Sequence, residues 1–260
     1  MRVAIIAPVA NTGNTTAATM IAAALACTQG VETTLMCTTT KARRLHDYLG
    51  IEYEEDITAS ITQLYELIRS NAIAPGECQD YLHKVTKNLM VLDTTSKGLS
   101  EDDRTAIMSH LFKSEVTPIT VCDVHWKPDL LTDENSLSIL EAADLIFVQV
   151  NGDLKNIEAF KRLKDTGLLP DKRYALLVNS FDERAASIRH WATAFDFKVR
   201  YTAKLHRSPY IQMAEEKGEL LSVVANALTD DPRVIELKQD FKEICQIITS
   251  HAKMRMKWEV

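Results

Sequence analysis

RVAIIAPVANTGNTTAATMIAAALACTQG, residues 2–30, joins a short β-branched apolar run to an alanine-rich segment through a polar turn. The run VAIIA predicts a strand, Pro8 ends it, and the stretch rich in Asn and Thr that follows predicts a loop. The stretch AATMIAAALACTQ favours a helix that ends at Gly30. A strand, a loop and a helix in this order predict the first unit of an α/β fold.

The same alternation of strand and helix continues along the chain. Strands are predicted at residues 33–37, 88–92, 119–123, 145–150 and 174–179 and near Val199. Helices are predicted between them, over 57–68, 100–112, 136–143, 157–164 and 185–195. This alternation predicts a mostly parallel, doubly wound sheet with helices on both faces. We expect residues 1–260 to form a single domain, because no repeat, low-complexity stretch or linker divides them.

Composition excludes several classes of protein. Hydrophobic residues make up 46% of the chain and charged residues 25%, which is typical of a soluble globular protein. No apolar run approaches the roughly 20 residues that span a bilayer, and the five cysteines are dispersed without a C-x-x-C pair. We therefore expect a cytoplasmic protein without disulfides. A formal net charge of −6 does not support binding to DNA.

The first predicted loop, residues 8–16, is where a ligand would bind, because sheets of this kind bind ligands beyond the carboxyl ends of their strands. A phosphate-binding loop needs glycines for close backbone approach, a lysine for the terminal phosphates and a hydroxyl for magnesium. Here Gly13 and the threonine hydroxyls are present, and Asn14 stands where the lysine is needed. The alternative is an ordinary strand-to-helix turn capped by Thr or Asn.

Four segments resemble the ParA/MinD group of deviant Walker P-loop ATPases, in the SIMIBI class. PVANTGNTTAATMIAAALA, residues 8–26, is similar to the K-G-G-x-G-K-T-T loop and first helix of that group. CDVHWKPDLLTDENSLSILEAADLIFVQV, residues 122–150, resembles its Walker B strand and the passage that follows. LLVNSFD, residues 176–182, resembles the strand whose asparagine reads adenine, and LHRSPYIQMAEEKGELLSV, residues 205–223, resembles a late P-Y-x-x-x-x-x-A-x-x-x-G segment.

The resemblance implies a P-loop NTPase-like fold and a nucleotide site. ATP or ADP with magnesium is the cofactor that it implies, with Thr15 and Asp123 as the magnesium ligands. The nucleotide-binding positions that it implies are Gly13, Asn14, Thr15, Thr16, Asp123 and Asn179.

The charged groups of that site are replaced. Val9 stands at the signature lysine, Asn14 at the second lysine, and Ala10 and Asn11 at the two early glycines. Cys37 stands where the group has an aspartate that orients the attacking water. Because phosphoryl transfer depends on such charges, we expect little or no intrinsic ATPase activity and assign no catalytic residue.

Two functions remain open from the sequence. The first is a non-catalytic ParA/MinD-like scaffold or positioning factor in partition, pilus assembly or secretion, with protein partners and any homodimer independent of ATP. The alternative is an ATPase with an unconventional phosphate clamp, such as Lys127 or a partner's residue, acting in plasmid or chromosome partition or in cell-pole positioning.

The C-terminal segment also allows two interpretations. Val234, Leu237, Phe241, Ile244 and Ile248 recur at helical spacing and predict a helix packed on the domain. The short basic tail HAKMRMKWEV, residues 251–260, resembles the membrane-contacting tail of MinD-type proteins and equally suits a partner-binding segment. Peripheral membrane contact through this tail is therefore a hypothesis beside the cytoplasmic location.

Overall fold

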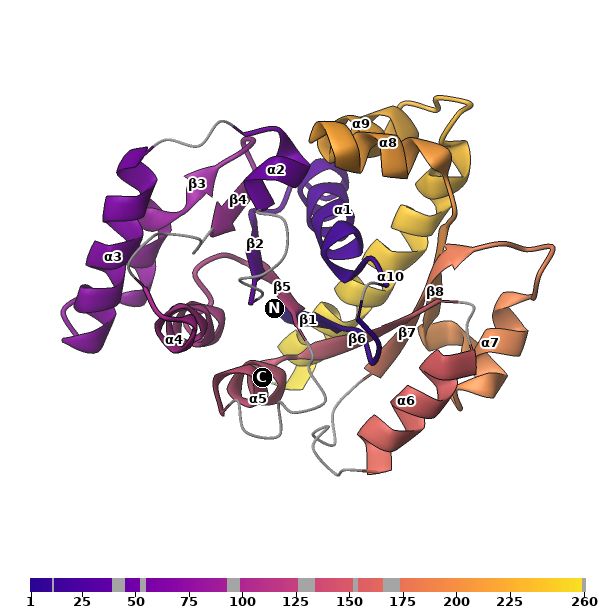
Figure 1. Ribbon diagram of the computed structural model, residues 1–260, viewed down its shortest axis with the longest axis horizontal. Coiled ribbons are helices and arrows are strands. Elements are labelled where there is room, and N and C mark those ends of the chain that lie inside the picture. The colour runs from indigo at the N-terminus through magenta and orange to yellow at the C-terminus, as the bar shows by residue number, and fades with distance from the viewer. Residues whose placement is uncertain are drawn as a thin grey trace.

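A computed structural model describes residues 1–10, 12–38, 45–51, 55–92, 99–125, 134–151, 154–165 and 174–258. The strands are β1 (Arg2–Ile6), β2 (Thr33–Cys37), β3 (His83–Lys84), β4 (Leu89–Leu92), β5 (Ile119–Val124), β6 (Leu145–Val150), β7 (Tyr174–Phe181) and β8 (Thr202–His206). They form one sheet in the order β3-β4-β2-β5-β1-β6-β7-β8 (Figure 1). Every neighbouring pair is parallel except β3 and β4, which confirms the mostly parallel sheet.

Helices cover both faces of the sheet, as a doubly wound fold requires (Figure 1). One face carries α1 (Asn14–Thr28), α2 (Leu45–Leu49), α8 (Pro209–Lys217), α9 (Leu220–Leu228) and α10 (Ile235–Trp258). The other face carries α3 (Glu55–Arg69), α4 (Glu101–Lys113), α5 (Glu134–Ala142), α6 (Leu154–Asp165) and α7 (Ile188–Ala194). The predicted α/β fold class is confirmed.

The central strands separate two hydrophobic cores. β5 and β6 are buried along their whole length, which fits strands that helices cover on both sides. Side chains alternate across β1, so that Val3 and Ile5 enter the core with α1, whereas Ala4 and Ile6 enter the core with α4 and α5. A single apolar run in the sequence therefore supplies both layers.

Helix α1 packs against the sheet and against α9 and α10. Its side chains are buried from Thr16 to Ala26, so almost no face is left to water. Alanine suits this place because it favours a helix and lets neighbouring elements approach closely. The helix begins beyond the carboxyl end of β1, where the predicted site lies.

A buried aspartate and a largely buried histidine join β8, at the edge of the sheet, to α10. The backbone N–H of His206 donates to Oδ2 of Asp240 at 2.8 Å, and Nδ1 of the same histidine lies 2.9 Å from that oxygen. Asp240 is fully buried. Because this carboxylate takes an outward backbone donor, it also protects the end of an edge strand.

The strand predicted near Val199 is present, but it begins three residues later than that position. Val199–Tyr201 form a 3-10 turn, and the strand begins at Thr202. The hydroxyl of Thr202 donates to the carbonyl oxygen of Lys198 at 3.1 Å and holds the turn. The following TAKLH carries the alternation of apolar and polar residues that marks a strand.

The predicted C-terminal helix is confirmed as α10. Its apolar positions are buried, and they are Leu237, Phe241, Ile244 and Ile248, with Val234 just before the helix. Within the described ranges, no helix is both long and apolar enough to cross a membrane.

Candidate functional site

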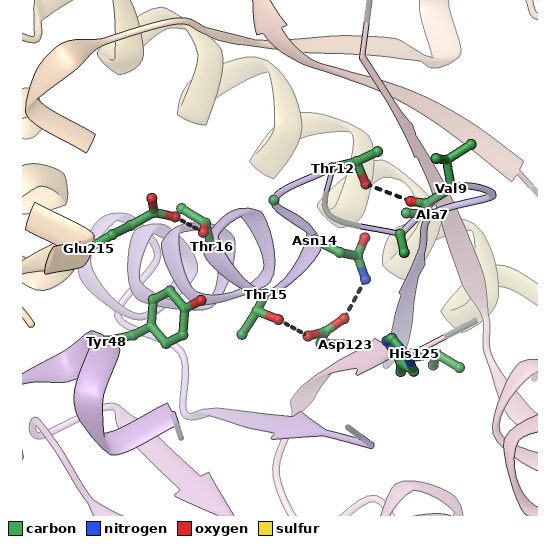
Figure 2. Close-up of a pocket in the computed structure, with 13 residues that line it drawn as sticks. Ala7, Val9, Thr12, Asn14, Thr15, Thr16, Tyr48, Asp123, His125 and Glu215 are labelled. Atoms are coloured by element: carbon green, nitrogen blue, oxygen red, sulfur yellow. Dashed lines mark hydrogen bonds between the residues drawn. The ribbon is translucent and has the colours of Figure 1, made fainter. Parts of the chain in front are cut away.

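A cavity of about 220 Å³ lies at the start of α1, beyond the carboxyl ends of β1 and β5. These two strands are neighbours, and their register places Ile5 beside Asp123. The lining residues come from the β1–α1 loop, the first turn of α1, α2, the end of β5 with the residue after it, and α8 (Figure 2). They are Ala7, Val9, Ala10, Thr12, Gly13, Asn14, Thr15, Thr16, Tyr48, Asp123, Val124, His125 and Glu215.

Gly13 precedes α1 in a left-handed conformation, with φ of 79°. A Cβ at this position would lie 2.8 Å from Nδ2 of Asn179, so a larger residue would be both strained and crowded. Nδ2 of Asn179 donates to the carbonyl oxygen of Thr12 at 2.6 Å, and Nε2 of Gln149 donates to the same oxygen at 2.7 Å. Side chains from β7 and β6 thus hold the loop in place.

The Asp123 carboxylate, only 2% exposed, accepts hydrogen bonds from three side chains. The Asn14 amide donates to Oδ1, and the Thr15 hydroxyl donates to Oδ2 at 2.5 Å (Figure 2). Sγ of Cys37 donates to Oδ2 at 3.1 Å. Both carboxylate oxygens are therefore engaged by neighbouring side chains.

Burial raises the pKa of the Asp123 carboxyl, and the hydrogen bonds from Thr15, Cys37 and Asn14 oppose that shift. All three donors are neutral groups. The second hydrogen of the Asn14 amide goes to the carbonyl oxygen of Ile5 at 3.0 Å. Asn14 thus uses its whole donor capacity inside the protein, whereas a lysine there would present its ammonium group to a ligand.

A second carboxylate faces the cavity from α8. The Thr16 hydroxyl donates to Oε1 of Glu215, and Figure 2 shows the two side chains meeting at the first turn of α1. Tyr48 of α2 and His125 after β5 complete the wall. Among the described lining residues there are two carboxylates, those of Asp123 and Glu215, and no lysine or arginine.

The structure brings together five of the six residues that the sequence predicts for a site: Gly13, Asn14, Thr15, Thr16 and Asp123 all line the cavity. Asn179 does not line it and instead contacts the back of the loop. Asn11 and Lys127 lie outside the described residues.

Three lining residues with titratable side chains were not predicted. His125 stands two residues after Asp123 at the same strand end, so its position carried a usable signal. Tyr48 and Glu215 come from α2 and α8, far from the loop in sequence; Glu215 falls within the resembling segment 205–223, but that resemblance did not single it out as a site residue. Only the packing of those two helices brings them to the cavity.

Among the described residues, the side chains at the site do not supply the cations that phosphoryl groups and magnesium chemistry require. The amide of Asn14 is committed within the protein, and two carboxylates face the space. Thr15 and Asp123, the predicted magnesium ligands, bond to each other. In the described part of the chain, no cluster of three or more His, Cys, Asp and Glu residues could hold a metal ion.

Comparison with solved structures identifies the fold. The septum site-determining protein MinD complexed with Mg-ADP from Pyrococcus horikoshii superposes with a TM-score of 0.70 at 15% identity, covering 97% of this chain and 98% of that one. A ParA family ATPase from Chlorobium tepidum superposes with a TM-score of 0.67 at 13% identity, covering 91% of this chain and 98% of that one. A complex of Cyanothece McdA with ATP gives 0.64 at 15% identity over 96% of each chain.

These likenesses confirm a ParA/MinD-like fold over nearly the whole chain. At such low identity they establish the fold alone. No protein-family model matches the sequence, and no curated protein matches it.

Proposed function

We propose that this protein is a ParA/MinD-like scaffold or positioning factor that does not hydrolyse ATP, acting in partition, pilus assembly or secretion. The observation that carries the proposal is the Asp123 network. In it the residue at the lysine position, Asn14, serves as an internal donor, and the described wall of the cavity has no lysine or arginine. Function then depends on surfaces that other proteins recognise.

One such surface lies on α8 and beside the segment before α10, where Tyr210, Met213 and Arg233 line one hollow. Among the described residues, the large apolar side chains that are exposed are Tyr210, Met213 and Ile235, at 37%, 48% and 48%. The Arg233 guanidinium lies 5.5 Å from the centre of the Tyr210 ring. Exposed aromatic and methionine side chains beside an arginine favour a protein partner, because these residue types are enriched at interfaces.

Any homodimer should form without ATP. Val9 lines the cavity at the position of the signature lysine, and its side chain has no charge to place on a partner's phosphates. Light scattering should therefore give the same mass with and without ATP and magnesium. A monomer that dimerises only on adding ATP would favour the ATPase alternative.

A phosphate-release assay tests the proposal. The purified protein should release phosphate from ATP no faster than buffer, with or without magnesium. Asn14→Lys should also stay inactive, because Val9 and Cys37 would still lack the charges that phosphoryl transfer needs. Magnesium-dependent turnover by the wild type that Asp123→Ala abolishes would overturn the proposal.

A further inference from the structure

The first turn of α1 carries no negative charge of its own. A helix N-terminus carries a partial positive charge, and its first backbone N–H groups have no partner within the helix. The residue before α1, Gly13, makes no side-chain capping hydrogen bond, and the first turn contains no acidic residue. In this fold a phosphate group would normally supply the charge.

Glu215 supplies that charge from another helix. The Thr16 hydroxyl, in the first turn of α1, donates to the Glu215 carboxylate, and both side chains line the same cavity as Asn14 and Thr15 (Figure 2). Thr16 is only 5% exposed. We propose that Glu215 is a built-in counter-anion for the N-terminus of α1, occupying by its charge the place that phosphate takes in a nucleotide-binding relative.

The position of α8 is set by tight backbone packing against α2. The helix begins with Ser208 as its cap and ends at Gly218, which has φ of 75°. A Cβ on Gly218 would lie 2.5 Å from the carbonyl oxygen of Asp47, and a Cβ on Gly50 would lie 2.6 Å from the carbonyl oxygen of Gly218. Two glycines thus allow α2 and α8 to meet closely, and this contact holds Glu215 at the cavity.

This inference rests on the proposed function and assigns a cause to the exclusion of phosphate. A carboxylate beside the first turn of α1 repels a phosphate group and places a negative charge near the positive end of the helix. The same contact ties α8, with its exposed Tyr210 and Met213, to the site without any nucleotide. The surface proposed for a partner is therefore held in one position.

Titration with inorganic tripolyphosphate, without magnesium and at low salt, tests the inference. The wild type, Glu215→Gln and the control Glu216→Gln would be compared by calorimetry. Both substitutions remove one negative charge from α8, but Glu216 is exposed and does not line the cavity. Glu215→Gln should bind tripolyphosphate at least about tenfold more tightly than the wild type, whereas Glu216→Gln should differ by less than about twofold.

Equal binding by Glu215→Gln and the wild type would overturn the inference, and so would equal gains in the two variants. Glu215→Ala repeats the test with a different shape. Failure of both Glu215 variants to melt cooperatively would also overturn it, since a counter-charge of this kind contributes only about 1 kcal/mol to stability. ATP hydrolysis by the wild type would contradict the proposed function instead, whatever the variants bind.

Discussion

Asp123 and Asp240 are both buried carboxylates, but their hydrogen-bond partners differ. Asp123 lies at a candidate ligand site, whereas Asp240 links α10 to β8. Asp123 ends in a cavity and accepts hydrogen bonds from the neutral side chains of Asn14, Thr15 and Cys37. Asp240 lies 0% exposed against His206, whose imidazole can carry a positive charge.

The comparison contrasts a carboxylate paired with a group that can carry a positive charge with one held by neutral side chains. A buried carboxylate with a structural role has a partner that can carry the opposite charge, as Asp240 has in His206. A carboxylate that binds a ligand normally keeps at least one oxygen free to contact it. Asp123 does neither, because its neighbours satisfy it with neutral donors, and we infer that the hydrogen bonds now replace the ligand as a link between α1, β2 and β5.

The largest effect should come from Asp240→Ala. Removing one partner of a buried charged pair leaves the other without compensation, at a cost of about 3 kcal/mol or more in the free energy of unfolding. Urea denaturation would measure it. Glu158→Ala is the control, because its pair with Arg162 is more than 70% exposed on both sides and should contribute less than about 1 kcal/mol. Equal losses in the two variants would remove the distinction between the buried pair and a surface pair.

Asp123→Asn should lower the free energy of unfolding by about 1–3 kcal/mol, because an amide nitrogen would face donors that now point at a carboxylate oxygen. The same urea experiment measures it. A more stable variant would mean that Asp123 lowers the stability of the fold because a ligand needs its carboxylate, as functional residues often do. That result would break the comparison with Asp240.

The His206 pair should make stability depend on pH. The hydrogen bond to Asp240 raises the pKa of His206 above its ordinary value of 6.5, while burial and, to a smaller extent, Lys204 oppose the shift. The stabilisation is complete below pH 6.5 and is lost as pH rises through the raised pKa of the folded state. Burial also raises the pKa of Asp240, and this shift likewise makes stability fall as pH rises, but over a lower range of pH.

Thermal melting between about pH 6 and pH 9 tests this dependence. The wild type should lose about 1–2 kcal/mol that His206→Gln does not lose, the usual contribution of a hydrogen bond to a charged group. Parallel profiles for the two proteins would show that the pair does not titrate in this window.

The succession of strands along the chain and the place of the loop could be predicted, because apolar runs and the turn at residues 8–16 are local signals. The position of Asp123 followed in the same way, since it lies near the end of a buried strand. The strand predicted near Val199 begins at Thr202 instead, because a β-branched residue alone does not distinguish a strand from the turn before it. The antiparallel β3, two residues long, gave no periodicity to detect.

The chemistry of the site was less predictable than its location. The sequence showed that Asn14 lacks a charge, but not that both of its amide hydrogens would be used within the protein. Glu215 stands 199 residues from Thr16, so only the tertiary packing of α8 reveals their contact. Asn179 was predicted from a resemblance to contact adenine, and in the structure its amide donates to the loop.

The most direct test of the account is the melting temperature with and without saturating ATP and magnesium. A ligand at about 100 times its Kd stabilises the folded state by about 2.7 kcal/mol, which shifts the melting temperature of a protein this size by several degrees. We predict no shift, because neutral donors already satisfy Asp123 and Glu215 faces the first turn of α1. A rise of several degrees that requires both ATP and magnesium, and that Asp123→Asn removes, would contradict the account.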